Sequence, residues 1–235
     1  MKYLLLLDDL WERMDLEKIR IPHPSKENGC KLIITTRSKD VCGKIELDEV
    51  IKVEFLSDEE AWNLFREKVG NVVDSSEVIR EIATKVVRKC RGLPLAIIVI
   101  GGCLRDKKGL SEWRNALKEL RSNKYETNDE MEESVFKILK FSYDQLKSNN
   151  IKNCFLYCAL YPEDYEIDVT KVVQRWFGEG FIDDDGRDFS RLDEAYDRRH
   201  SIINYLKNVS LLEGLVVANP VGMVGTVKML NSDGH

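Results

Sequence analysis

The sequence predicts a mixed fold, in which a parallel α/β unit is followed by a helical bundle and then by helices closed with a small β wing. Three observations predict it. Short aliphatic runs alternate with amphipathic segments over residues 1–70, as in a parallel sheet with helical connections. From Glu77 onward the strands stop and apolar residues recur at helical spacing. Near the C-terminus, two short β-prone runs follow two further helices.

The aliphatic runs are the predicted strands of the parallel sheet. Tyr3–Leu7 is followed directly by Asp8-Asp9, and Cys30–Thr36 is followed by Arg37. Strands that are buried in a parallel sheet are continuous hydrophobic runs of this kind. A shorter, alternating run, Val50–Phe55, predicts a third strand.

Helices are expected between and after these strands. Two segments, around Leu10–Lys18 and Lys39–Lys44, connect the predicted strands. A clear helix begins after Ser57, because Ser57 and Glu60 have the spacing of a capping box and an apolar stripe follows them.

The middle of the chain predicts a helical bundle. Gly92 supplies a stop for one helix, and Pro94 suits the first turn of the next. The polar stretch Ser122–Glu130 is expected to be a surface loop. The helices expected in this part are Glu77–Cys90, Leu95–Leu104, Glu112–Leu120, Met131–Leu146 and Ile151–Leu160.

The last part predicts a winged helix, that is, helices followed by a β wing. Asp168 is the expected N-cap of its first helix. An acidic loop, Asp183–Gly186, leads to a long helix around Leu192–Lys207. The wing is a predicted hairpin of Leu215–Ala218 and Thr226–Met229.

Composition excludes several classes of protein. Hydrophobic residues make up 43% and charged residues 33% of the chain, which is a globular composition and not that of a disordered or collagenous one. The net charge of -5 argues against a protein that mainly coats DNA or an anionic membrane. The longest apolar windows, Tyr3–Leu7 and Leu93–Ile100, are too short to span a bilayer. The six cysteines show no close-paired framework, so we expect buried free thiols and a reducing, cytoplasmic setting.

Two neighbouring strand ends carry the candidate chemistry. After the first strand, one carboxylate of Asp8-Asp9 could hold Mg²⁺ while the other orients an attacking water. After the second strand, the guanidinium of Arg37 could meet a terminal phosphate. Taken alone, two acids after a strand are also common as a turn or a helix cap, and an arginine at a strand end is also common as a plain surface residue.

Four motifs in order carry a resemblance to a known family. On these motifs the chain resembles the NB-ARC nucleotide-binding module of plant disease-resistance proteins, which are intracellular receptors with leucine-rich repeats. Trp11 and the residues of the last motif resemble those of the family branch whose members carry an N-terminal coiled coil. The motifs are KYLLLLDDLW (Lys2–Trp11), GCKLIITTRS (Gly29–Ser38), GLPLA (Gly92–Ala96) and CFLYCALYPEDYE (Cys154–Glu166).

The resemblance implies a switch that holds ADP at rest and exchanges it for ATP on activation, in a slow ATPase-type family. It implies that Asp8 is the metal-side acid that binds Mg²⁺ and that Asp9 is the candidate catalytic acid. It further implies that Arg37 senses the γ-phosphate and that Pro94 packs near the adenine. Expected partners are nucleotide, the coiled coil and leucine-rich repeats of the same receptor, or full-length receptors.

The resemblance also implies a division into subdomains. Residues 1–70 would be the later part of a P-loop NTPase domain, residues 71–150 the helical subdomain, and residues 151–235 an incomplete winged-helix subdomain. In the family, a histidine and an aspartate follow the methionine that ends the winged helix; here Leu230 and Asn231 follow Met229.

One departure from the family bears on mechanism. No G-x-x-x-x-G-K-[ST] string, the glycine-rich loop that cradles phosphates, occurs in the chain. We therefore expect an N-terminally truncated fragment that binds nucleotide very weakly. By family topology the P-loop strand lies between the Arg37 strand and Val50–Phe55, so strand edges would be left unpaired.

Two alternative functions remain open. The chain could be a truncated interaction module that associates with full-length receptors without binding nucleotide. It could also be a winged-helix DNA-binding regulator with Lys171 and Arg175 on its recognition helix, although Glu179 and Asp183–Asp185 make that end acidic and groove entry needs a basic face. Cys154 and Cys158 are expected to be core thiols and not metal ligands.

Overall fold

The chain forms two compact units, Met1–Glu54 and Phe55–His235, which are described separately. The computed structural model describes residues 2–12, 14–18, 20–25, 27–45, 47–122, 130–162, 165–182, 201–214, 216–219 and 222–229. Within these residues, no helix is both long enough and apolar enough to cross a bilayer.

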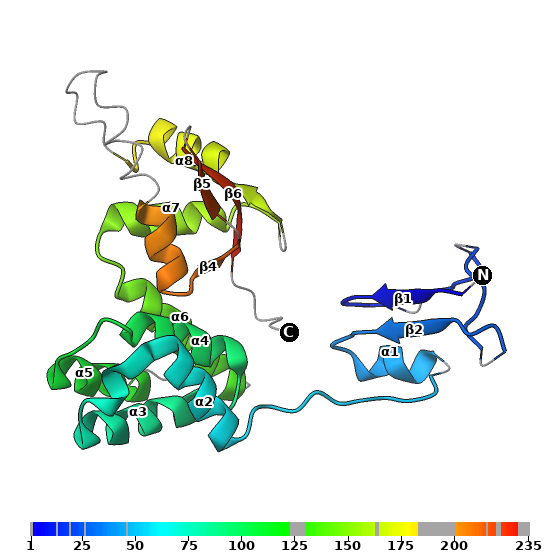
Figure 1. Cartoon of the computed structure of the whole chain (residues 1–235), viewed down its shortest axis with the longest axis horizontal. Coiled ribbons are helices and arrows are strands. Elements are labelled where there is room, and N and C mark those ends of the chain that lie inside the picture. The colour runs from blue at the N-terminus through cyan, green and yellow to red at the C-terminus, as the bar shows by residue number, and fades with distance from the viewer. Residues whose placement is uncertain are drawn as a thin grey trace. The chain divides into compact units, whose positions relative to one another are not determined.

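The first unit contains a two-stranded parallel sheet and a short helix (Figure 1). Strand β1 (Leu4–Leu7) pairs with β2 (Lys31–Ile34), and helix α1 (Lys39–Lys44) follows. The register places Leu7 opposite Ile34, so both strands end at the same edge. Two of the predicted strands, and the helix after the second one, are therefore confirmed.

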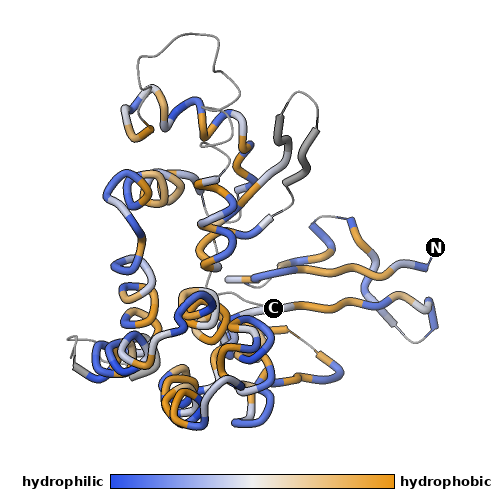
Figure 2. The backbone as a smooth tube through the Cα atoms, turned by 60° about the vertical axis from the view of Figure 1, so that its left-hand side comes forward, coloured by the Kyte–Doolittle hydropathy of each residue, from blue (hydrophilic) through white to orange (hydrophobic). Residues whose placement is uncertain are grey.

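Both strands are strongly hydrophobic (Figure 2). One face of the small sheet is exposed. Side chains alternate between half-buried and exposed along β1 and β2. Leu4, Leu6 and Ile33 are more than half exposed. Sheets made only of parallel strands are normally covered on both faces, so this face is an unusual surface for a parallel pair.

The predicted third strand is wrong. Residues 50–55 form no strand, and Val53 is 91% exposed. A strand needs a neighbour that accepts and donates its backbone hydrogen bonds, and none pairs with this segment within the described residues.

The predicted helix around Leu10–Lys18 is also wrong in the residues that the structure describes there. The backbone N–H of Leu10 bonds to the carbonyl of Thr35, at 2.9 Å, and not to its own segment. Residues 16–18 form a turn in which Ile21 N–H bonds to Leu16 O. The Leu10 carbonyl, which would accept the first hydrogen bond of a helix that begins there, accepts instead from the Thr36 hydroxyl at 2.6 Å.

The second unit begins with a bundle of helices around one hydrophobic core (Figure 1). Helix α4 is apolar on all sides and nine of its residues are buried, so it lies at the centre of the bundle. It packs against α2 and α6, while α3 packs against α5. The elements are α2 (Asp58–Val69), the 3₁₀ helix η1 (Gly70–Asp74), α3 (Glu77–Lys89), α4 (Pro94–Leu104), α5 (Leu110–Ser122) and α6 (Glu130–Asp144).

Local signals in the sequence explain where these helices begin and end. The hydroxyl of Ser57 accepts from the backbone N–H of Glu60 at 3.3 Å, and the Glu60 carboxylate accepts from the Ser57 N–H at 2.9 Å, which confirms the capping box. Gly92 has a φ of 75°, which an L side chain rarely adopts, and Pro94 is the first residue of α4.

The remainder of the second unit combines helices with an antiparallel sheet. Strand β6 (Gly222–Met229) pairs with β3 (Ile167–Asp168), with β4 (Leu212–Glu213) and with β5 (Val216–Asn219). A C-terminal hairpin is present as the β5–β6 pair, but β5 pairs with residues 222–225 of β6. The predicted second strand, Thr226–Met229, pairs with β3 and β4 instead, so the predicted pairing partner is wrong. The helices are α7 (Asn149–Cys158), α8 (Val169–Gly178) and a helical segment at 201–208.

Helix α8 begins as expected, because the Asp168 carboxylate accepts from the Lys171 N–H at 2.8 Å. Three expectations lie wholly or partly outside the described residues. They are the loop at Ser122–Glu130, the acidic loop at Asp183–Gly186 and the first half of the helix at Leu192–Lys207.

We predict that Gly92→Ala lowers the free energy of unfolding of the full chain by about 2 kcal/mol or more. A Cβ at this position would lie 2.3 Å from the carbonyl oxygen of Leu56, and the Gly92 carbonyl accepts a backbone bond from Leu56 N at 2.9 Å. Urea unfolding followed by circular dichroism measures the change.

Gly178→Ala is the matched control, because nothing lies within 4 Å of the Cβ that it adds at the end of α8. It should leave stability unchanged or raise it slightly, since alanine favours helix over glycine. Equal losses for the two variants would contradict the assigned role of Gly92.

Candidate functional site

The candidate site lies at the edge where β1 and β2 both end. Because the two strands are parallel, the residues after Leu7 and after Ile34 come together. Thr35 N–H extends the pairing by bonding to the carbonyl of Leu7 at 2.9 Å. Asp8, Asp9 and Arg37, which the sequence predicted as a cluster, are therefore brought to one edge.

The chain turns sharply at the second aspartate. Asp9 has a φ of 47°, in the left-handed region, which aspartate tolerates better than most side chains. Its backbone N–H donates to the hydroxyl of Thr35 at 2.8 Å. The same hydroxyl donates to the Asp8 carboxylate, so Thr35 links both aspartates to the end of β2.

A bidentate ion pair joins the predicted acid and the predicted arginine. Nε of Arg37 donates to one carboxylate oxygen of Asp9 at 3.0 Å, and a terminal nitrogen donates to the other at 2.8 Å. Both side chains remain partly exposed, Arg37 at 45% and Asp9 at 41%. Bidentate geometry fixes the guanidinium in one orientation.

Trp11 contacts both members of this ion pair. Its indole Nε1 donates to the Asp9 carboxylate at 2.9 Å. The guanidinium carbon of Arg37 lies 4.3 Å from the centre of the indole ring, within the range of a cation–π contact. Trp11 is itself 66% exposed, so it covers the pair from the solvent side.

The roles of Trp11 and Thr35 are the part of the site that the sequence reasoning missed. Both residues lie inside quoted motifs, where Trp11 indicated only a family branch and Thr35 only a strand end. Usable signals were present: an aromatic ring two residues after an acid, and a hydroxyl residue two positions before an arginine.

The hydrogen bonds lower the pKa of Asp9. The donation from Arg37 is the largest cause, and the Trp11 N–H and the positive charge of Arg37 lower the pKa further, against a partial desolvation that raises it. Asp9 therefore stays ionised throughout the physiological pH range, and both its oxygens are engaged by donors.

Asp8 is the residue of this site that fits a metal ion chemically. A carboxylate oxygen is the ligand type that Mg²⁺ prefers, and Mg²⁺ commonly takes only one or two carboxylates besides water and phosphates. The described residues contain no group of three or more histidine, cysteine or acidic side chains arranged to hold a metal.

Pro94, the fourth predicted site residue, belongs to the second unit, where it opens α4. Its packing near an adenine stays a prediction.

Five of the six cysteines are buried free thiols, as expected, while Cys42 is half-buried. Cys154 and Cys158 are fully buried on α7, and burial raises the pKa of each thiol to about 12. Burial likewise raises the pKa of Cys103 to about 11. Such thiols are protonated and inert at neutral pH, which agrees with their assignment to the core.

We predict that Arg37→Gln raises the pKa of Asp9 toward its ordinary value, because the dominant donor is lost. A lowered native pKa contributes stability above the unfolded pKa, and this contribution disappears as the pH falls through the native pKa. Carboxyl-carbon NMR of the full chain, titrated from pH 6 downward, measures the shift.

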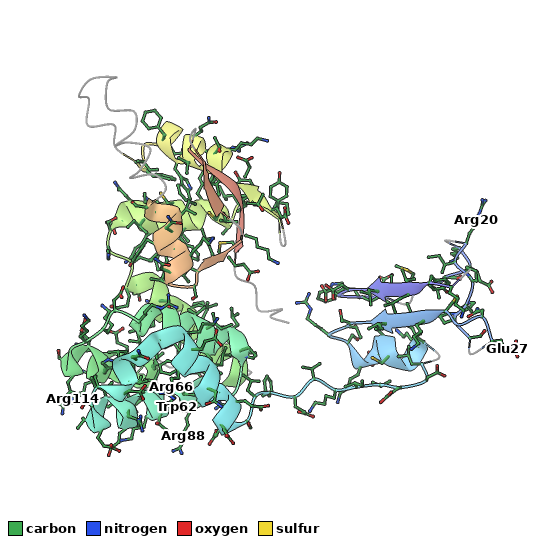
Figure 3. The ribbon with its side chains drawn as sticks, in the orientation of Figure 1. Arg20, Glu27, Trp62, Arg66, Arg88 and Arg114 are labelled. Carbon is green, nitrogen blue, oxygen red and sulfur yellow. The ribbon has the colours of Figure 1, made fainter. Side chains whose placement is uncertain are left out.

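Arg20→Gln provides the control, since Arg20 is an exposed arginine of the same unit that makes no side-chain contact with Asp9 (Figure 3). It should leave the Asp9 titration unchanged. An unchanged titration in Arg37→Gln would show that the ion pair is not formed in solution.

Comparison with known proteins places this site in a family. Residues 1–75 match the NB-ARC domain. Disease resistance protein RPS5 of Arabidopsis thaliana is 47% identical over 189 residues, covering 80% of this chain and 21% of RPS5. Disease resistance protein SUMM2 of the same organism is 44% identical over 90% of this chain and 23% of its own length.

A probable disease resistance protein of Arabidopsis thaliana is 44% identical over 99% of this chain, which corresponds to 27% of that relative. The chain thus spans about a quarter of the length of the curated relatives it matches. The domain match and the identity over most of the sequence agree with each other: residues 1–75 belong to the NB-ARC family, and the chain is similar over most of its length to a part of plant disease-resistance proteins.

Proposed function

We propose that this chain is part of a plant intracellular immune receptor, in which its NB-ARC module acts as an ADP/ATP-dependent switch in the cytoplasm. The single observation that carries the proposal is the strand-end cluster of Asp8, Asp9 and Arg37. NB-ARC proteins generally bind nucleotide, and two carboxylates beside an arginine are the groups that phosphates and Mg²⁺ require.

Each residue has a proposed role. Asp8 would hold Mg²⁺, which neutralises phosphate charge when it is bound, and Asp9 would orient a water as the candidate catalytic acid. Arg37 would contact the terminal phosphate, because its fork of donors matches phosphate oxygens. Pro94 would pack near the adenine.

We further propose that residues 1–70, 71–150 and 151–235 correspond to the nucleotide-binding, helical and winged-helix subdomains. The two-stranded parallel sheet supports the first assignment. The antiparallel pairing of β6 with three other strands, next to helix α8, supports the last. The coiled coil and leucine-rich repeats of the receptor are the proposed partners.

We predict that the purified chain binds Mg·ADP and Mg·ATP with dissociation constants above roughly 1 mM. Its 235 residues contain no glycine-rich phosphate loop, and the strand-end cluster supplies only the metal-side and terminal-phosphate contacts. Isothermal titration calorimetry tests this, and micromolar binding would contradict it.

The switch is tested in a chimera, in which the matched 189 residues of RPS5 are replaced by their counterpart from this chain. Adenine nucleotide released from the purified chimera is quantified by chromatography. We predict that it retains nucleotide, and that Arg37→Gln lowers the ratio of bound ATP to ADP several-fold while Arg20→Gln does not.

A chimera that carries no nucleotide, or an Arg37→Gln ratio equal to that of the parent, would overturn the proposal. The second candidate, a module that associates with full-length receptors without binding nucleotide, would then be favoured. The exposed apolar face of Leu4, Leu6 and Ile33 and the exposed segment at 50–55 are the observations that support it.

A further inference from the structure

A groove lies between helices α2 and α3 of the second unit, and two of its residues, Trp62 and Arg88, are labelled in Figure 3. Its volume is about 310 Å³, at the lower end of the range found for small-molecule sites. Nothing in the proposed nucleotide switch uses it. The lining residues are Asp58, Trp62, Arg80, Thr84, Val87 and Arg88.

The walls of the groove are mainly apolar, and one of them is a fixed aromatic ring. Trp62 is half-buried and packs against Phe65, with ring centres 6.1 Å apart. Val87 is buried below the opening. A planar apolar group could stack on the indole without disturbing the core, because the Trp62 ring already packs against Phe65.

The charged residues around the groove favour an anion. Asp74 accepts hydrogen bonds from Arg66 at 2.8 Å and from Arg80 at 2.6 Å, so one carboxylate serves two guanidinium groups. Arg88 has no acidic group within ion-pair distance among the described residues. The lining itself therefore holds two arginines, Arg80 and Arg88, and one carboxylate, Asp58.

We propose that this groove binds a small organic carboxylate with a planar apolar body. Arg88 pairs with the carboxylate, and the body lies against the indole of Trp62 and the side chain of Val87. Charge-assisted contact with a guanidinium gives orientation, and apolar contact gives most of the affinity. Asp58 limits the affinity, because its negative charge lies at the same groove.

The tryptophans of the chain make the test selective. There are four, and Trp113 and Trp176 are fully buried in the core while Trp11 belongs to the first unit. The indole N–H resonances of the isotope-labelled full chain are followed by NMR during titration with 2-naphthoate, and Trp62→Phe assigns the Trp62 signal.

We expect the Trp62 signal alone to move, with a dissociation constant of about 1 mM, as befits a ligand of this size. Arg88→Gln should weaken binding about tenfold, and Asp58→Asn should strengthen it about twofold. Arg114→Gln is the matched control, because Arg114 is an exposed arginine on α5 that does not line the groove (Figure 3).

Two further ligands test the contributions of the carboxylate and of the aromatic body separately. The neutral 2-naphthamide and the small anion acetate should each bind at least tenfold more weakly than 2-naphthoate. The proposal is overturned if 2-naphthoate leaves the Trp62 signal unmoved, if the amide binds equally well, or if Arg88→Gln and Arg114→Gln have the same effect.

Discussion

In the part of the chain that the structure describes, a strand forms only where another strand takes up its backbone hydrogen bonds. β1 and β2 pair with each other, and β6 pairs with β3, β4 and β5. Residues 50–55 are similarly aliphatic but have no such neighbour in the described chain, and they form no strand. Unpaired backbone groups must be solvated, so the segment lies exposed with its apolar side chains. The candidate site depends on the same constraint, because only the β1–β2 pairing brings the two strand ends together.

This constraint also explains which parts of the fold could be predicted from sequence. Signals that act within one helical turn were sufficient, as at the Ser57–Glu60 capping box and the Asp168 cap. Predictions failed where the outcome depended on a distant partner. The helix around Leu10–Lys18 does not form, and both backbone groups of Leu10 bond instead to Thr35 and Thr36, which follow β2; no local pattern reveals these partners.

The candidate site, like the fold, could be predicted from sequence only in part. The position of Asp8, Asp9 and Arg37 at strand ends could be predicted, because parallel topology alone brings such residues to one edge. Which side chains pair within the cluster could not be, because this depends on the left-handed turn at Asp9 and on side-chain geometry. The ring of Trp11 contacts both partners of the ion pair; its spacing from Asp9 indicates a contact with the acid, but not the contact with Arg37 on the other segment.

The ion pair has a consequence for how the proposed switch would recognise a phosphate. Arg37 presents one edge of its guanidinium to both oxygens of Asp9, and a phosphate that sought the same edge would have to displace that carboxylate. Both side chains are over 40% exposed, and ion pairs this open contribute little stability. A terminal phosphate, with more negative charge and more acceptor oxygens than a carboxylate, would therefore compete successfully. Its arrival at Arg37 would free one oxygen of Asp9 and leave the other bonded to Trp11 alone, so phosphate sensing and the partial release of the candidate catalytic acid would be one event.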